Sequence, residues 1–308
     1  MRIGINGTPL VAKASVAAVV EHARRAELDG FSSYWLAEHP SGGFDALTVL
    51  TVVGQSVTGM ELGTAVIPTY PRHPLVLAGQ ARTAASAMAA PLTLGIGLSH
   101  QPMLAALGLS DDKPIRHLRD YLSVLVPLLA EGKVDHEGPT ISCRAALFAP
   151  AEPPVPVVVA ALGPQMLRLA GARTDGTSLA WVGVNTIRDH IVPTISEAAA
   201  AAGRAAPRII ATLPVCVTDE PEKVRARISA AAAWYAELPS YRAMFEREGA
   251  GSPGEVALVG SAAEVEDRLH GLAAAGVTDY SASESVTNET ERDETRALLR
   301  SVAARLAA

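Results

Sequence analysis

The sequence predicts an α/β fold, a (β/α)8 TIM barrel with insertions, on three observations. Strand-like and helix-like segments alternate along the chain about eight times, the number of units that closes a parallel barrel. The length of 308 residues suits one barrel, which runs to about 250 residues or more as a single domain. The composition is 49% hydrophobic and 19% charged, which supplies a sizeable core and argues against disorder.

The expected strands are short apolar or β-branched runs. In order they are Arg2–Asn6, Ser33–Ala37, Leu62–Val66, Leu92–Gly97, Val155–Ala161, Gly176–Trp181, Arg208–Val217 and Thr278–Ala282. The expected helices follow these runs. In order they are Ser15–Asp29, Asp45–Ser56, Pro74–Met88, Arg116–Ala130, Pro164–Ala172, Ile187–Ala202, Pro221–Glu237 and Glu291–Ala307. Some ends are recognisable, since Ser15 is placed to cap the first helix and Gly30 to stop it.

Two segments interrupt the alternation. Residues 131–154 form a polar, Gly- and Pro-rich insertion, and residues 238–276 hold an extra helical pair before the last strand. The second helix of that pair is expected to begin at the capping box Ser261-Ala-Ala-Glu264. Neither insertion carries enough apolar residues for a core of its own, so we expect a single domain over 1–308. An open doubly wound sheet is the alternative, although no Gly-rich phosphate fingerprint follows the first strand.

The charge and the termini exclude several classes of protein. The net charge is −6 and the pI is near 5.8, and no basic block is present, which argues against nucleic acid as a partner. No apolar run is long enough to span a bilayer, and Met1–Asn6 reads as a strand rather than a signal peptide. Cys143 and Cys216 fit neither a disulfide framework nor a metal site. We therefore expect a soluble, cytoplasmic protein with reduced thiols.

The stretch Gly63–Pro74 is the most distinctive in the chain. It begins as a buried strand and then breaks into three prolines, with Arg72 and His73 between the last two. The prolines stiffen the backbone where the strand leaves the core, and Pro74 opens the next helix. A rigid strand-to-helix corner with polar side chains is typical of an active site at the carboxyl face of a barrel. The alternative is a proline-rich surface turn.

Two histidines stand at other strand ends. Glu38-His39 ends the second strand, where an imidazole titrates near neutral pH and Glu38 could hold its tautomer or charge. The fourth strand ends near His100, and Gly95 and Gly97 within it predict close approach of the backbone to something flat. The alternative for His39 is that it only caps the strand. The alternative for the two histidines together is that they occur at strand ends by coincidence. No carboxylate or thiol stands at ligand spacing, so no metal is expected.

Two further strand ends carry weaker signals. Gly163-Pro164 begins the helix after the fifth strand, where free backbone N–H groups and the helix dipole favour an anion such as a phosphate. Many helices begin with Gly-Pro, however, so this signal is not specific. Trp181 ends the sixth strand and offers an aromatic wall. A Ser-His-Asp hydrolase is not expected, because the Gly-x-Ser-x-Gly elbow is missing.

Together these motifs resemble the bacterial luciferase-like monooxygenase superfamily over nearly the whole chain. The motifs are Glu38-His39, Leu62–Pro74, Gly95–His100 and Ala161–Gln165. The resemblance is nearest to the branch whose members use the deazaflavin coenzyme F420. It implies a TIM barrel with insertions, usually a homodimer, with the cofactor ring at the carboxyl face of the barrel.

The resemblance also implies roles for individual residues. His39 matches a histidine near the reactive carbon of the ring, and the turn Leu162–Pro164 matches the one that receives the cofactor phosphate. The full set implied or expected to contact the cofactor is His39, Thr64, Ala65, Val66, Gly97, Leu98, Ser99, His100, Leu162, Gly163, Pro164 and Trp181. Members often have a non-prolyl cis peptide in the strand-3 bulge, which we predict at Ala65–Val66. Sugar-phosphate dehydrogenases of this branch have glutamate where His100 stands, so their substrate is not expected.

The expected activity is F420-dependent transfer of a hydride between the deazaflavin and a small, largely apolar organic substrate. His39, paired with Glu38, is expected to stabilise charge or exchange the proton, with His100 as the other candidate. One alternative is a luciferase-like monooxygenase that uses FMN, as reduced flavin, and oxygen. Another is a non-catalytic flavin- or deazaflavin-binding protein that keeps the site without turnover.

Overall fold

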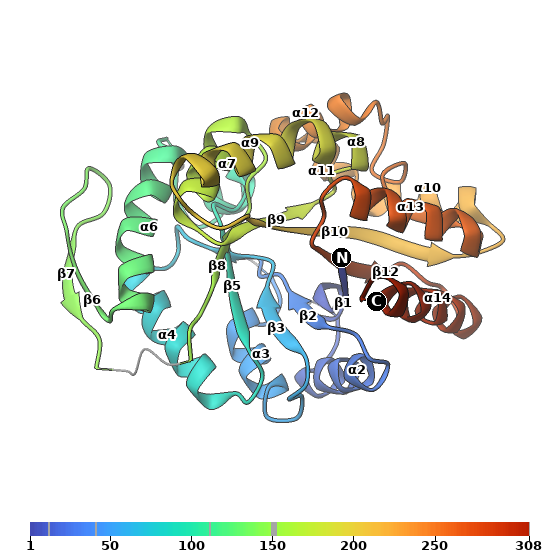
Figure 1. The fold of residues 1–308 in the computed structure, drawn as a ribbon, viewed down its shortest axis with the longest axis horizontal. Coiled ribbons are helices and arrows are strands. Elements are labelled where there is room, and N and C mark those ends of the chain that lie inside the picture. Colours follow the sequence, from blue (N-terminus) through green and yellow to red (C-terminus); the bar gives the residue numbers. More distant parts are fainter. Residues whose placement is uncertain (12, 41, 111, 149–152, 308) are drawn as a thin grey trace.

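Eight parallel strands close into a barrel in the computed structural model, which describes residues 1–11, 13–40, 42–110, 112–148 and 153–307 (Figure 1). In barrel order the strands are β1 (Arg2–Asn6), β2 (Ser33–Leu36), β3 (Glu61–Thr64), β5 (Leu92–Gly97), β8 (Val157–Val159), β9 (Gly176–Ala180), β10 (Arg208–Val217) and β12 (Asp279–Glu284). Each pairs with the next, and β12 pairs with β1, with Arg2 opposite Asp279. The predicted (β/α)8 barrel is confirmed.

The longer helices surround the strands (Figure 1). They are α2 (Val16–Leu28), α3 (Ala46–Val53), α4 (Pro74–Ala87), α6 (Pro114–Ala130), α7 (Pro164–Arg173), α9 (Val192–Ala201), α10 (Pro221–Ala231), α12 (Pro239–Glu248), α13 (Ala262–Ala274) and α14 (Glu289–Ala307). Short helices lie in the connections, namely α1 (Thr8–Val11), α5 (Gln101–Ala105), α8 (Val184–Thr186) and α11 (Ala233–Glu237), and a π-helical turn over Ile187–Ile191 leads into α9. No helix in the described ranges is long and apolar enough to cross a membrane.

The predicted helix ends agree with the structure. The Ser15 side chain accepts a hydrogen bond from the Ala18 N–H at the start of α2, and Gly30 follows that helix with a φ of 82°. Ser261 and Glu264 form the reciprocal capping box of α13. These local signals work because a cap satisfies backbone groups within a few residues of itself.

One expected strand has different bounds, and the first insertion contains strands that were not predicted. The strand expected over Leu62–Val66 ends at Thr64, and a separate short strand β4 (Ile67–Pro68) pairs with β5. The insertion 131–154 contains an antiparallel hairpin of β6 (Lys133–His136) and β7 (Cys143–Ala146), which lies beside α6 (Figure 1). Four of the eight strand residues are exposed, and only Val134, Cys143 and Ala145 contact the core, so each strand is too short to show a clear apolar alternation. Residues 149–152 of this insertion lie outside the described residues.

The second insertion also differs from the expected helical pair. It contains α12 and α13, but the three-residue strand β11 (Leu258–Gly260) lies between them. β11 pairs with β10 at Val215–Val217, beyond the part of β10 that pairs with β9. A strand this short gives no periodic signal, since two residues on each face are needed to show alternation. The helix expected over Pro221–Glu237 is likewise divided, into α10 and α11.

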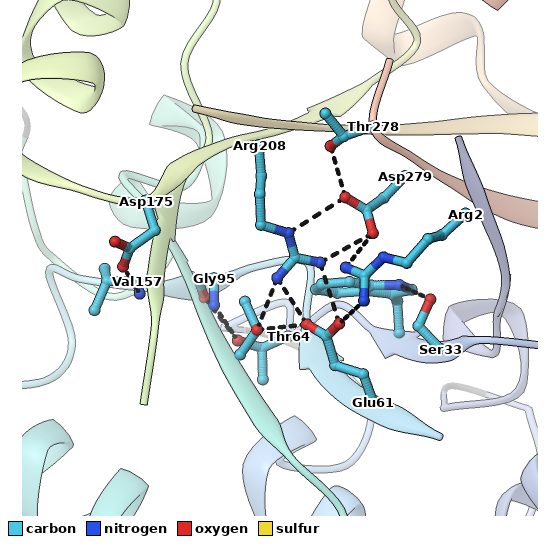
Figure 2. A network of polar contacts seen from close by, with 12 residues as sticks. Arg2, Ser33, Glu61, Thr64, Gly95, Val157, Asp175, Arg208, Thr278 and Asp279 are labelled. Carbon is cyan, nitrogen blue, oxygen red and sulfur yellow. Dashed lines mark hydrogen bonds and ion pairs between the residues drawn. The ribbon is translucent and has the colours of Figure 1, made fainter. Parts of the chain in front are cut away.

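An ionic network fills the amino-terminal end of the barrel (Figure 2). Arg208 of β10 reaches across to Glu61 of β3, with Nη1 2.8 Å from Oε1, and to Asp279 of β12, with Nη2 3.0 Å from Oδ1. Arg2 of β1 binds the same two carboxylates. Burial raises the pKa of Asp279, but the hydrogen bond and charge of Arg208 outweigh it and hold the pKa below its usual value. The network therefore ties four strands together through two largely buried carboxylates.

An apolar layer lies above this network. Trp35, Val158 and Ile210 form a small cluster inside the barrel, separate from the main core between the strands and the helices. The Arg208 guanidinium lies 5.9 Å from the centroid of the Trp35 ring. Cys143 and Cys216 are buried free thiols, as expected. The interior is thus built in layers, with charges at the amino end and apolar side chains above them.

Arg208→Met should lower the free energy of unfolding by about 3 kcal/mol at pH 7, because it leaves buried carboxylates without one of their partners. The lowered pKa of Asp279 means that this stabilisation is present at neutral pH and is lost as the pH falls below its unfolded value of 3.8. Urea denaturation at several pH values measures both effects. Arg144→Met is the control, because Arg144 and Asp135 form an exposed pair worth about 0–1 kcal/mol. Equal losses in the two variants would contradict the role of the network.

Candidate active site at the carboxyl ends of the strands

The predicted site residues lie at the carboxyl end of the barrel, on neighbouring strands. Glu38 and His39 follow β2, Thr64–Val66 begins at the last residue of β3, and Gly97–His100 begins at the last residue of β5. Leu162–Pro164 follows β8, and Trp181 follows β9. Because β2, β3, β5, β8 and β9 are consecutive in the barrel, these five groups form an arc around one side of its mouth. The structure therefore brings together groups that are up to 143 residues apart in sequence (181 minus 38).

The floor of this arc is a bulge between β3 and β4. The Ala65–Val66 peptide bond is cis, as predicted. The Ala65 N–H donates to the Leu36 carbonyl at 2.8 Å, and the Glu38 N–H donates to the Val66 carbonyl at 3.2 Å, so the end of β2 holds the bulge in place. Both residues of the cis bond are half-exposed. Ala65 packs on the interior cluster beneath it.

The glycines of β5 make room for this bulge. The Thr64 hydroxyl donates to the Gly95 carbonyl and accepts from the Gly95 N–H, both at 2.8 Å (Figure 2). A Cβ atom on Gly95 would lie 2.0 Å from the Thr64 carbonyl oxygen, and one on Gly97 would lie 2.6 Å from a Val66 methyl group. The predicted close approach is correct. The approaching group, however, is the protein's own bulge rather than a flat ligand.

Glu38 binds an arginine rather than His39. Its carboxylate accepts two hydrogen bonds from Arg72, at 2.5 and 3.3 Å, and one from the Ala46 N–H at the start of α3, at 3.1 Å. Arg72 also pairs with Asp45, the N-cap residue of α3. Arg72 was noted in the sequence as part of the proline corner, but its partners lie 34 and 27 residues away and no local pattern indicates them.

His39 is therefore coupled to Glu38 through charge, and no hydrogen bond between them is found in the described part of the chain. Burial lowers the pKa of His39 below 6.5, and the Glu38 charge acts in the opposite direction. His100 is affected more strongly, because burial and the nearby His39 lower its pKa to about 4. Both imidazoles are neutral at pH 7, so each can donate a hydrogen bond from one nitrogen and accept one at the other.

His100 lies against aromatic side chains that sequence reasoning did not assign to the site. The distances between ring centroids are 5.2 Å to Trp234, 5.9 Å to Tyr235 and 5.8 Å to Tyr241. These residues come from α11 and α12, and Trp181 also contacts Tyr235 at 5.5 Å. The sequence signal that could have indicated them is the adjacent pair Trp234-Tyr235 in an alanine-rich segment, because the chain has few aromatic residues.

Two residues of the arc have an unusual backbone. Ser99 and Trp181 have φ values of 71° and 61°, the left-handed region that non-glycine residues seldom adopt. Such conformations cost about 1–3 kcal/mol and cluster at functional sites. Leu98, which precedes Ser99, is half-buried against the main core. The strain thus falls at two strand ends of the predicted site.

The start of α7 offers an open helix terminus. Gly163 is its N-cap residue, supplies no side-chain cap, and has nothing within 4 Å of the position where a Cβ would stand. Pro164 occupies the first turn. The preceding Leu162 carbonyl lies 2.8 Å from His190 Nε2, which fixes the turn to the next connection. Uncapped backbone N–H groups with open space before them suit an anion.

His117 of α6 is a further imidazole near the proline corner, and it was not selected from the sequence. Its Nε2 lies 3.0 Å from the Thr69 hydroxyl, and its ring stacks on Tyr70 at 3.9 Å. Burial lowers its pKa to about 4, against the charge of Asp120. A lone histidine in the first turn of a helix gives no motif, so only the fold places it here. Within the described residues, no group of three or more His, Cys, Asp or Glu side chains is arranged to hold a metal ion.

A profile of the luciferase-like monooxygenase family matches residues 3–279, most of the chain. The chain belongs to the luciferase-like monooxygenase family. This luciferase-like chain is 29% identical over 170 residues to 5,10-methylenetetrahydromethanopterin reductase of Methanolobus tindarius, covering 55% of the chain and 52% of the relative. It is 30% identical over 214 residues to F420-dependent glucose-6-phosphate dehydrogenase of Beutenbergia cavernae, covering 65% and 64%. These matches span about half to two thirds of the relatives' length.

Solved structures share the fold over nearly the whole luciferase-like chain. The coenzyme F420 dependent tetrahydromethanopterin reductase from Methanopyrus kandleri superposes with a TM-score of 0.81 at 21% identity, covering 97% of each chain. The oxygenating constituent of 3,6-diketocamphane monooxygenase from Pseudomonas putida, solved in complex with FMN, has a TM-score of 0.77 at 16% identity, covering 99% and 98%. At these identities the likeness establishes the fold alone.

Gly95→Ala in this luciferase-like protein should lower the free energy of unfolding by about 2 kcal/mol or more, because its Cβ meets the backbone of the bulge. The matched control is Gly79→Ala in α4, where a Cβ meets nothing within 4 Å. That change should be neutral or stabilising by about 0.5–1 kcal/mol, since alanine favours a helix. Urea denaturation followed by circular dichroism compares the two. Similar stability of both variants would show that β5 does not need glycine at this position.

Proposed function

We propose that this chain is a coenzyme F420-dependent oxidoreductase that transfers a hydride between the deazaflavin and a small organic substrate. The observation that carries the proposal is the Thr64–Val66 bulge, a half-exposed floor at the barrel mouth with a neutral imidazole on the strand to either side. The name of the Beutenbergia cavernae relative supports F420 as the cofactor.

The residues of the site fit such a cofactor. The Ala65–Val66 peptide gives a flat floor for a ring, and Gly97–His100 borders it on β5. The turn Leu162–Pro164 and the uncapped start of α7 would hold the phosphate, since nothing occupies the space beside Gly163. Thr64 positions the floor through Gly95, and Trp181 stands at the end of the arc. When bound, a deazaflavin supplies a carbon centre that donates or accepts a hydride.

The two histidines are suited to different tasks. A proton-exchanging group is most effective when its pKa is near the working pH. His39 fits this better, because the charge of Glu38 opposes the effect of burial on its pKa. His100, with a pKa of about 4, stays neutral and serves as a hydrogen-bonding and packing group. A carbonyl substrate would gain the hydride at carbon and a proton at oxygen, and we assign the proton to the protonated form of His39. In the reverse direction, neutral His39 would accept the hydroxyl proton of an alcohol as the hydride leaves carbon.

Arg72 positions His39 without contacting the reacting atoms. It joins Glu38 at the end of β2 to Asp45 at the start of α3, and so fixes the loop that carries His39 at both ends. Its single positive charge faces the two carboxylates of Glu38 and Asp45, so the three groups together stay negative, in agreement with the effect of Glu38 on the pKa of His39. One domain over residues 1–308, a homodimer, a small-molecule substrate and a cytoplasmic location remain predictions.

An FMN-dependent monooxygenase is the second candidate. The observation in its favour is that an FMN complex of a diketocamphane monooxygenase shares the fold with a TM-score of 0.77. The same floor and phosphate turn would accept either ring. A non-catalytic binding protein is the third candidate, and it would keep the cofactor affinity without turnover.

Purified protein should bind oxidised F420 with a micromolar Kd, at least about 10-fold tighter than FMN, a difference of about 1.4 kcal/mol. Titration followed by quenching of the cofactor fluorescence measures both affinities. Tighter binding of FMN than of F420 would instead favour assignment of the protein as a flavin-dependent monooxygenase. Binding of neither cofactor would refute the assignment of the site.

His39→Ala should lower kcat by about 10²-fold or more while the Kd for F420 changes by less than about 3-fold, because general acid–base catalysis contributes that much. Because burial lowers the pKa of His39 below 6.5, its protonated form becomes scarce above that pH, so wild-type carbonyl reduction should slow as the pH rises above 6.5. Oxidation of an alcohol, which needs the neutral form, should slow only at lower pH. His73→Ala is the control, since His73 is an exposed helix cap. Near-normal turnover in His39→Ala with intact cofactor binding would exclude this role for His39.

A further inference from the structure

The part of the barrel mouth over β9 and β10 has features that the roles above do not use. Four aromatic side chains gather there, and we call them the aromatic cluster: Trp181, Trp234, Tyr235 and Tyr241. Tyr235 is central, with its ring centroid 4.0 Å from that of Trp234, 4.9 Å from Tyr241 and 5.5 Å from Trp181. The cluster also contacts His100 on the opposite side of the arc.

The helices that carry this cluster are fixed to the barrel. The Glu248 carboxylate, near the end of α12, accepts hydrogen bonds from the N–H groups of Asn185 and Thr186 at 3.2 and 2.8 Å. The Thr186 hydroxyl donates to the Met244 carbonyl at 3.2 Å. These contacts hold α12 to the connection that follows Trp181. The aromatic cluster is therefore a positioned wall rather than a loose loop.

A buried hydroxyl group stands at the base of this wall. Ile210 of β10 belongs to the interior cluster with Trp35, so Thr212, two residues further on, faces the same interior one step nearer the carboxyl end. Thr212 is opposite Ala180 in the sheet, and its carbonyl accepts from the Trp181 N–H at 3.3 Å. Its Oγ1 is buried, and among the described residues it has no hydrogen-bond partner.

The Thr212 hydroxyl differs in this respect from other buried threonine hydroxyls of the barrel strands. The Thr177 hydroxyl of the neighbouring strand donates to the Val159 carbonyl at 2.8 Å, and the Thr64 hydroxyl bonds Gly95. Buried hydroxyl groups are nearly always hydrogen-bonded, because an unpaired one costs stability. A hydroxyl left unpaired at the mouth of a barrel, on the side opposite the Ala65 floor, is suited to bind a ligand atom.

We propose that Thr212 and the aromatic cluster form the subsite for the second reactant, an uncharged molecule with a flat apolar body and a hydrogen-bond-accepting oxygen. The aromatic rings receive the flat body by stacking and edge contacts, and the Thr212 hydroxyl donates to the oxygen. The walls named here carry no formal charge at neutral pH, so an anionic substrate gains nothing from them. The proposal rests on the proposed function for the reaction, but the binding it describes is independent of the cofactor.

The first test concerns stability without any ligand. Thr212→Val removes the unpaired hydroxyl while keeping the shape of the side chain, so the Tm should stay the same or rise. Thr177→Val is the matched control, and loss of its buried hydrogen bond should lower the Tm by about 2 °C or more. Differential scanning calorimetry of the whole protein measures both. An equal fall in the two variants would overturn the proposal, because it would show that the Thr212 hydroxyl is already paired.

The second test compares two probes that differ in one group. Acetophenone has a flat body and a carbonyl oxygen, and α-methylstyrene has the same shape without the oxygen. Isothermal titration calorimetry should show wild type binding acetophenone at least about 10-fold tighter than α-methylstyrene, since one hydrogen bond contributes about that much. Thr212→Val should remove this difference and Thr212→Ser should keep it. Glucose 6-phosphate, a charged probe, should bind more weakly than acetophenone.

The outcomes separate this subsite from the cofactor assignment. Loss of the acetophenone preference in Thr212→Val, with the Kd for F420 unchanged, supports the subsite. If wild type binds F420 but does not distinguish the two probes, the subsite is refuted and the proposed function stands. If wild type distinguishes the probes but does not bind F420, the subsite stands and the proposed function falls.

Discussion

The contact between the β3 bulge and β5 is the constraint on which the candidate site depends. The Thr64 hydroxyl joins both backbone groups of Gly95, and the absence of a side chain at Gly95 and Gly97 lets the bulge lie directly against the neighbouring strand. The bulge in turn anchors the end of β2 through the Glu38 N–H. One close approach therefore fixes the floor of the site and the strand end that carries His39.

Charge is distributed unevenly along the barrel axis. The amino-terminal end contains compensated ions, with Arg208 and Arg2 bound to the carboxylates of Glu61 and Asp279. At the carboxyl end the imidazoles of His39 and His100 are held neutral by burial. The ion pairs of the mouth, Arg72 with Glu38 and Asp45, lie beside β2, whereas the aromatic cluster over β9 and β10 carries no formal charge. The apolar layer containing Trp35 separates the two ends.

Sequence reasoning correctly predicted the features that are determined by residues close together in the chain. The bounds of Arg2–Asn6, Leu92–Gly97 and Arg208–Val217 agree with β1, β5 and β10 because hydrophobic runs and turn residues mark them. Family resemblance placed the Ala65–Val66 cis bond. The partner of Glu38 and the aromatic cluster over His100 come from chain segments tens of residues away. No local sequence pattern specifies which distant segment will contact these residues. The hairpin over 133–146 was missed because each strand has only four residues, and Val134, Cys143 and Ala145 alone contact the core.

The strand β10 is long enough to extend beyond the barrel, and the segment that follows it is attached outside the barrel core. Beyond Thr212 the strand leaves β9, and β11 takes the vacated edge, so the ten-residue strand continues past the rim of the barrel. The segment from α10 to α12 is therefore attached at both ends to paired strands. Changes within this segment would leave the floor on β3 and β5 undisturbed, so the fold allows selectivity to change there without redesign of its core.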